Sequence, residues 1–290
     1  MDSATFFVQC LNAVQYGLLL FLVASGLTLI FGIMGVINLA HGSFYMLGAY
    51  LAFGLSPLFG GNFALMLLAG VALSALFGFV LEWVFFSFLY QREHLQQVLL
   101  TYALILVFEE ARSMLVGNDV HGVPIPAWLA GGFPLGDLMS YPWYRLFASA
   151  ACVAVACALY WVVNRTRLGM MIRAGASNRQ MVRSLGIDIH LLYRIVFAGG
   201  VALAALAGMI AAPMSSVYPG MGASVLIICF VVVVIGGIGS ITGALVASLL
   251  VGFVDTFGKV FFAEYSGIGV YLLMAIVLVW RPEGLMGART

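Results

Sequence analysis

Charged residues are scarce in this chain. Its 290 residues include 12 Lys and Arg and 11 Asp and Glu, so charged residues make up 8% of the sequence, whereas soluble proteins have about 25%. Apolar and aromatic residues make up 64%, and the few charges cannot cover a water-exposed surface. The composition therefore excludes a soluble enzyme and indicates an integral membrane protein.

Lysine and cysteine are rarer still. The one lysine, Lys259, is followed by Val260 and not by the Ser or Thr of a Walker A motif, so this chain does not carry that ATP-binding loop. The four cysteines lie in apolar runs and lack the spacing of metal ligands or of a disulfide framework. We therefore expect no metal site and no cofactor. The net charge of +1 argues against a nucleic-acid partner, which usually requires a basic excess.

Long apolar runs dominate what is present. Nine segments are membrane candidates, near residues 9–31, 36–55, 63–90, 96–116, 143–163, 192–213, 222–236, 241–260 and 264–280. Because a helix crosses the hydrocarbon core in about 20 residues, the sequence predicts an all-α, polytopic transmembrane helix bundle with about 8 to 10 membrane segments, in a single domain spanning 1–290. Asn38 and His41 interrupt the second segment and glycines end the seventh, so either can be a broken or re-entrant element.

Basic residues are unevenly distributed between the loops. Six of the twelve fall in or beside the loop at 164–191, and cytoplasmic loops carry an excess of Lys and Arg. Placing this loop in the cytoplasm puts nine of the twelve basic residues inside. The loop at 117–142 and the N-terminus are then expected outside.

Small residues recur at four-residue spacing in three segments, a pattern that lets helix backbones approach closely in lipid. The three sets are Gly70, Ser74 and Gly78; Gly200, Ala204 and Gly208; and Ala244, Ser248 and Gly252. We expect each set to mark a tight helix contact.

A polar group interrupts the second segment. In GVINLAHGSFYMLGAY (residues 35–50), the side chains of Asn38, His41 and Ser43 lie next to glycines that can open the backbone. Polar groups at membrane depth need a partner or a water-filled cavity, and broken helices occur at transport sites. Two interpretations are open: contact with a transported substrate, or a hydrogen-bonded helix junction in which Asn38 or Ser43 caps a half-helix.

Carboxylates also occur within the apolar segments, as Glu82, Glu109 and Glu110. Arg112 follows Glu109 at a spacing of three residues, which places both on one helix face. A local ion pair is therefore expected, rather than the midplane carboxylates that ion-coupled transporters use.

The loop at 164–191 contains a short amphipathic helix. Its residues of interest are Ser177, Arg179, Met181, Val182, Arg183, Leu185 and Gly186. The serine is expected to cap the helix and the glycine to end it; the three apolar residues form a stripe, while the two arginines point elsewhere. Such a helix of two to three turns either lies on the lipid surface or inserts into a groove of a partner protein.

Five stretches together resemble one family, the permease subunits of ABC importers for branched-chain amino acids, and in particular its H-type membrane subunit. They are GVINLAHGSFYMLGAY, LQQVLLTYALILVFEE, RTRLGMMIRAGASNRQMVRSLGI, VVVVIGGIGSITGALVASLLVG and RPEGLMG, which follow the family's order and cover nearly the whole chain. The resemblance implies an ABC-importer permease fold in which residues 177–186 are the coupling helix that docks on an ATPase. One departure is Ser43, because many relatives carry an acidic residue after the AHG triplet.

The resemblance also implies a function. The chain is expected to be a transport subunit rather than an enzyme, in the inner membrane of a bacterium, moving leucine, isoleucine or valine into the cytoplasm. Its implied partners are a homologous second permease, two cytoplasmic ATP-binding subunits that hydrolyse ATP, an extracytoplasmic substrate-binding protein and membrane lipid. Alternatives are a permease for urea or short-chain amides in the same family and an ion-coupled secondary transporter. An intramembrane protease is disfavoured because the sequence has no GxSxG elbow.

Overall fold

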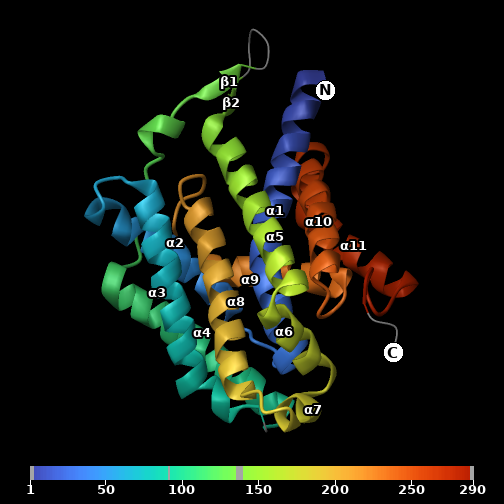
Figure 1. The fold of residues 1–290 in the computed structure, drawn as a ribbon. Coiled ribbons are helices and arrows are strands. Elements are labelled where there is room, and N and C mark those ends of the chain that lie inside the picture. Colours follow the sequence, from blue (N-terminus) through green and yellow to red (C-terminus); the bar gives the residue numbers. More distant parts are fainter. Residues whose placement is uncertain (1–2, 91, 135–139, 288–290) are drawn as a thin grey trace.

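The computed structural model describes residues 3–90, 92–134 and 140–287, most of which are helical (Figure 1). The helices are α1 (Ser3–Met34), α2 (His41–Leu58), α3 (Phe63–Val84), α4 (His94–Val116), α5 (Trp143–Arg165), α6 (Arg167–Ser177), α7 (Arg179–Ser184), α8 (Ile189–Ala211), α9 (Met221–Gly236), α10 (Ile241–Phe261) and α11 (Ser266–Trp280). Short 3-10 turns lie at Phe86–Phe88, Ala127–Leu129 and Ala263–Tyr265, and strands β1 (Gly132–Pro134) and β2 (Ser140–Pro142) pair antiparallel. The predicted all-α class is confirmed.

Within the described residues, five helices are long and apolar enough to cross a membrane: α1, α3, α5, α8 and α10. The other four predicted segments fall short for local reasons. α9 and α11 have 16 and 15 residues, α2 begins with a polar histidine, and α4 carries three charged residues near its C-terminal end. The bundle is thus polytopic, but only part of the predicted set has the length and composition of a full span.

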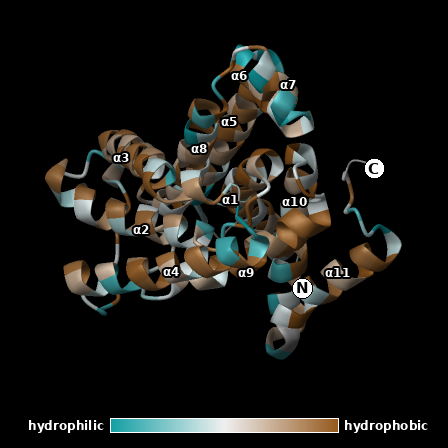
Figure 2. Ribbon diagram, turned by 90° about the horizontal axis from the view of Figure 1, so that it is seen from below, coloured by the Kyte–Doolittle hydropathy of each residue, from teal (hydrophilic) through white to brown (hydrophobic). Residues whose placement is uncertain are grey.

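The first helix forms the centre of the bundle, and Figure 2 shows α1 surrounded by other helices. Every residue from Gly17 to Ile30 is buried, and α1 packs against α5, α8, α9 and α10. A helix that is apolar on all sides is expected in such an interior position. The outer helices α3, α4 and α11 instead expose large apolar side chains, including Leu68, Leu106 and Leu272, and a surface of that kind fits lipid.

All three predicted sets of small residues lie at helix contacts. A Cβ atom on Gly26 of α1 would lie 2.5 Å from the carbonyl oxygen of Gly200, and one on Gly17 would lie 2.8 Å from that of Ser248. Likewise, a Cβ atom on Gly78 of α3 would lie 2.8 Å from the Cβ of Val201. The backbones of α8 and α10 therefore approach α1 closely, and α3 approaches α8 closely, as the spacing predicted.

The two long loops lie at opposite ends of the molecule. β1, β2 and the N-terminal end of α1 lie at the top of Figure 1, whereas α6 and α7 lie at the bottom. The hydrophilic residues of α6 and α7 also stand out in Figure 2. The predicted orientation requires the two loops to lie at opposite ends of the bundle, as they do. The side of the membrane that each end faces stays a prediction. Arg289, one of the nine basic residues expected inside, lies outside the described residues.

Candidate transport path and coupling surface

The second helix begins inside the bundle. The Nε2–H of His41 donates a hydrogen bond to the main-chain carbonyl of Val23, with an N–O distance of 2.9 Å. Val23 lies eleven residues before the end of α1, which is about 16 Å along the helix axis. Residues 35–40 therefore run back into the molecule before α2 starts, so the second predicted segment is broken at its beginning.

The polar residues of this segment meet at the junction. Asn38, His41 and Ser43 are at most 5% exposed. Asn38 Oδ1 accepts a hydrogen bond from the N–H of Ala40 at 3.0 Å, and Ala40 is itself the residue that precedes the first turn of α2. Asn38 thus fixes the turn before the helix. No side chain caps α2, so the predicted cap by Asn38 or Ser43 is wrong, although the predicted junction is present.

Two nitrogen atoms at this junction lack partners. Among the described residues, nothing hydrogen-bonds to Nδ2 of Asn38 or to Nδ1 of His41, and both atoms are buried. A buried polar group without a partner costs about 1–3 kcal/mol. The junction therefore contains two unsatisfied polar groups within the interior of the bundle.

The first turns of α2 and α9 cross in the interior. A Cβ atom on Gly42 would collide with the carbonyl oxygen of Gly222, and one on Gly222 would lie 2.8 Å from the carbonyl oxygen of Gly42. Gly220, with a φ of 79°, allows α9 to begin abruptly at Met221. Two helix N-termini, each with a positive dipole end, therefore lie side by side.

A cavity of about 470 Å³ lies next to this crossing. Val23 and Tyr45 form part of its wall, whereas Asn38, His41 and Ser43 do not. Its polar residues include Gln15, Arg145 and Lys259. Sequence reasoning missed these three because they come from α1, α5 and α10, which are far apart along the chain. The sequence held one signal for this group. Asp255 and Lys259 are four residues apart, as in a helical ion pair, and Nζ of Lys259 lies 2.5 Å from Oδ2 of Asp255.

The loop at 164–191 forms two helices rather than one. α6 ends at Ser177, and Asn178 caps the six-residue α7, because its Oδ1 accepts the N–H of Met181 at 3.0 Å. The predicted cap by Ser177 and the predicted length of two to three turns are therefore wrong. Gly186 follows the helix with a φ of 82°, which agrees with its predicted role in ending it.

The predicted apolar stripe is divided between two faces of α7. Val182 is 2% exposed, whereas Met181 is 60% exposed and Leu185 is 72% exposed. Val182 therefore anchors α7 to the bundle, since a buried side chain of that kind contributes about 1.5–3 kcal/mol. Met181 and Leu185 are left for lipid or a partner.

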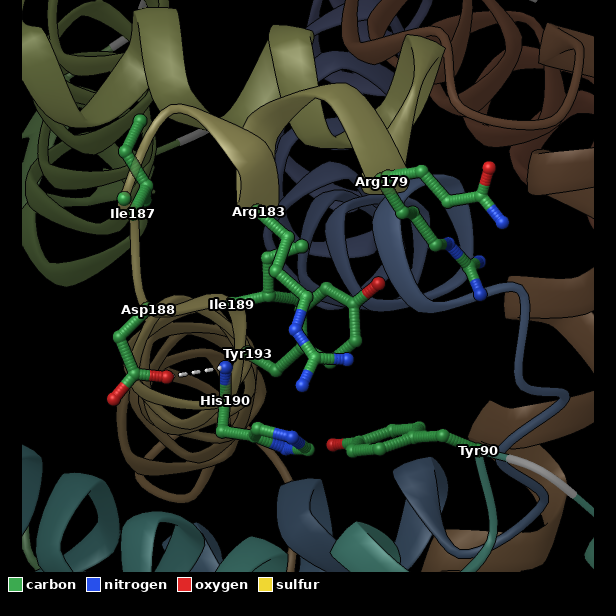
Figure 3. A pocket seen from close by; sticks show the side chains of 10 residues that line it. Tyr90, Arg179, Arg183, Ile187, Asp188, Ile189, His190 and Tyr193 are labelled. Carbon is green, nitrogen blue, oxygen red and sulfur yellow. Dashed lines mark hydrogen bonds between the residues drawn. The ribbon is translucent and has the colours of Figure 1, made fainter.

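One of the two arginines also turns inward. Arg179 Nη2 donates to the carbonyl oxygen of Ile33 at 3.0 Å, and its guanidinium carbon lies 5.9 Å from the ring centroid of Tyr193. Figure 3 shows Arg179 and Arg183 projecting from α7 into a pocket that His190 and Tyr193 also line. Arg179 thus joins α7 to the end of the central helix. It points into the bundle, as Val182 does, and not away from the apolar side chains as the sequence predicted.

Two of the three predicted intramembrane carboxylates, Glu82 and Glu109, are paired, whereas Glu110 is exposed. Glu82 is fully buried, accepts a hydrogen bond from the Tyr90 hydroxyl, and lies 3.2 Å from Nε of Arg194 on α8. Glu109 pairs with Arg112 at 3.2 Å, which confirms the predicted local ion pair. Both pairs satisfy the charge of the carboxylate within the bundle.

Comparisons with known proteins identify the family. The model of the family described as branched-chain amino acid transport system, permease component, matches residues 9–278. The chain is 32% identical to the high-affinity branched-chain amino acid transport system permease protein BraD of Pseudomonas aeruginosa, over 96% of this chain and 95% of that protein. It is 26% identical to the corresponding permease LivH of Escherichia coli K12, over 97% and 96%. The ribose import permease RbsC of the same organism is 30% identical over 46% of this chain and 37% of its own length. The chain therefore belongs to the permease family of branched-chain amino acid transport systems.

Proposed function

We propose that this chain is one of two membrane-spanning permease subunits of an ATP-driven importer that moves leucine, isoleucine and valine across the inner membrane of a bacterium. The family match over residues 9–278 carries this proposal. Two relatives named as branched-chain amino acid permeases align over at least 95% of both chains, so nearly the whole of this chain corresponds to nearly the whole of each relative. The likeness to a ribose permease covers less than half of the chain and carries no substrate proposal.

The chain is proposed to act with a homologous second permease, two cytoplasmic ATP-binding subunits and an extracytoplasmic substrate-binding protein. α7 supports the contact with an ATP-binding subunit, because Met181 and Leu185 expose apolar side chains at a hydrophilic end of the molecule. A short helix of this kind fits a groove on a partner protein. ATP hydrolysis would then occur on the partner chains and move α7.

The start of α2 is proposed as part of the transport path. Asn38, His41 and Ser43 lie at the crossing of α2 and α9, and the free nitrogen atoms of Asn38 and His41 are polar groups in an otherwise apolar interior. Helix N-termini favour a substrate carboxylate at transport sites. Separation of Gly42 from Gly222 would open this crossing during transport.

Uptake by the reconstituted complex tests the proposal. The chain is expressed with the partner subunits of its own organism, placed in proteoliposomes, and supplied with radiolabelled leucine. We expect uptake that requires ATP, persists with a proton ionophore, and is reduced by unlabelled isoleucine and valine but not by urea. Uptake by the chain alone that depends on an ion gradient would contradict the proposal. Competition by urea or acetamide without competition by valine would indicate the other branch of the family.

A further inference from the structure

We infer that the cavity between α1 and α9 binds a zwitterionic amino acid with an apolar side chain before it passes the crossing of α2 and α9. This inference rests on the proposed function, since it names the place where the substrate of that function binds. The cavity volume of about 470 Å³ falls within the range of about 300–1,000 Å³ for small-molecule sites. Helices α1, α2, α5, α9 and α10 all contribute to its wall.

Two cations line one part of this cavity. Arg145 lies in the first turn of α5, directly after β2, and its Nη1 donates to Asn12 Oδ1 at 2.6 Å. A guanidinium group has five N–H donors, so this bond leaves others for a carboxylate. Lys259 Nζ lies 2.5 Å from Asp255 Oδ2 and 5.5 Å from the ring centroid of Tyr16. Both cations therefore lie near residues 12–16 of α1, toward the end of the molecule where α1 begins.

The cavity also offers groups that suit an ammonium ion. Besides Tyr16, whose ring lies beside Lys259, Tyr45 and Tyr218 belong to its wall, and tyrosine rings attract cations by about 0.5–2 kcal/mol. Gln15 is 6% exposed, and its Nε2 donates to the sulfur of Met214 at 3.2 Å. The amide oxygen of Gln15 is then the group that can accept a hydrogen bond from a ligand.

An apolar surface lies deeper in the same cavity. Leu19, Leu20 and Val23 continue the lining face of α1, and Val225 and Ile228 face them from α9. Seven residues of helix separate Tyr16 from Val23, a rise of about 10 Å. An amino acid would thus bind with its carboxylate near the two cations and with a branched apolar side chain toward the α2 and α9 crossing. This order of polar and apolar groups matches the two ends of leucine, isoleucine or valine.

Filling the cavity tests the inference in the assembled, transporting complex. Val225→Trp places a large ring in the cavity, whereas Ile227→Trp places the same ring on an α9 side chain that is 51% exposed and outside the wall. We expect Val225→Trp to lower leucine uptake by about tenfold or more and Ile227→Trp to stay within about twofold of wild type. Both variants should keep wild-type amounts of complex. Near wild-type uptake by Val225→Trp would overturn the inference.

A labelling experiment keeps the inference testable if Val225→Trp fails to assemble. Ser224 lies in the cavity wall and Val120 is exposed in the loop after α4; each is changed to cysteine in a chain whose four native cysteines are replaced. We expect excess leucine to slow modification of Ser224→Cys by an impermeant thiol reagent by about threefold or more, and to leave Val120→Cys unaffected. Leucinamide, which lacks the carboxylate, should protect less, and Arg145→Gln with Lys259→Gln should abolish the protection by leucine.

The two proposals fail in different ways. A wild-type complex that does not import leucine contradicts the proposed function. A complex that imports leucine, but in which leucine gives no protection at Ser224→Cys, contradicts the cavity inference alone.

Discussion

His41 joins the start of α2 to the central helix through its hydrogen bond to the Val23 carbonyl. The imidazole is fully buried, and a buried hydrogen bond of this kind contributes about 0.5–1.5 kcal/mol. That amount is small beside the stability of a packed bundle, so the loss of the bond should disturb the position of α2 more than the fold. We therefore expect substitutions at this junction to impair transport more than assembly.

His41→Leu is predicted to lower leucine uptake by about tenfold or more while the complex still forms, with ATP hydrolysis partly uncoupled from transport. Asn38→Leu should act in the same way, because it removes the bond to the Ala40 N–H. His41→Gln is the control, since its amide can still donate to Val23. Failure of both leucine variants to assemble would mean that these residues are structural only. Uptake within about twofold of wild type for both would remove them from the path.

Gly42→Ala is predicted to separate α2 from α9, because the added Cβ would collide with the Gly222 carbonyl oxygen. We expect a lower midpoint of thermal unfolding in detergent and a loss of uptake. Gly54→Ala on the same helix is the matched control, since a Cβ there meets no atom within 4 Å and alanine favours helix by about 1 kcal/mol. Equal midpoints for the two variants would show that the crossing tolerates separation.

At the scale of single elements, α7 combines an anchoring face and a free face in six residues. Val182 and Arg179 hold the helix to the bundle, and Met181 and Leu185 stay exposed. A force applied to the free face by a partner would therefore be transmitted to the end of α1 through the Arg179 bond to Ile33.

Charge on the two faces of α7 is predicted to have different effects. Met181→Asp and Leu185→Asp should abolish transport and weaken co-purification of the ATP-binding subunits, while the amount of the chain in the membrane stays nearly unchanged. Val182→Asp buries an unpaired carboxylate and should lower the amount of folded chain itself. Immunoblots of membranes and pull-downs in mild detergent measure the two outcomes. Normal uptake with Asp at position 181 or 185 would instead favour the lipid surface as the contact of this helix.

The Glu82 and Arg194 pair links α3 to α8. Removing one partner of a buried ion pair costs about 3–5 kcal/mol, because the other charge stays buried without compensation. Arg194→Met is thus predicted to lower the midpoint of thermal unfolding strongly, and Glu82→Gln in the same chain should recover most of the loss. No recovery in the double variant would mean that Arg194 stabilises the bundle through packing rather than charge.

For the whole molecule, the positions of the strands and of α6 and α7 at opposite ends predict which residues a reagent outside the cell can reach. Val120 lies in the loop between α4 and β1, and Ser177 is the last residue of α6; β1 and α6 lie toward opposite ends of the molecule in Figure 1. In a chain without native cysteines, an impermeant thiol reagent applied to intact cells should label Val120→Cys and not Ser177→Cys. Both should react after the membrane is permeabilised. Labelling of Ser177→Cys in intact cells would reverse the orientation.

Structural features that depend on one stretch of sequence could be predicted, whereas features formed by residues from distant stretches could not. The Gly70, Ser74 and Gly78 set lies at a helix contact because four-residue spacing alone places the residues on one face. The cavity lined by Gln15, Arg145 and Lys259 depends on how three helices pack, which spacing does not encode. The cap of α7 was missed for a local reason: adjacent Ser177 and Asn178 are both good capping residues, so the sequence did not decide between them.

The burial of the middle of α1, from Gly17 to Ile30, has a consequence for the order of assembly in the membrane. Its enclosing partners α8, α9 and α10 are synthesised well over a hundred residues later than α1, so the ribosome delivers the centre of the bundle to lipid long before its surroundings exist. During that interval the run from Gly17 to Ile30 meets acyl chains on every side, and its nearly uninterrupted apolar sequence makes this state tolerable. Packing of small residues then exchanges lipid for protein contacts. An early helix that is stable on its own thus becomes the template on which the later half of the chain closes.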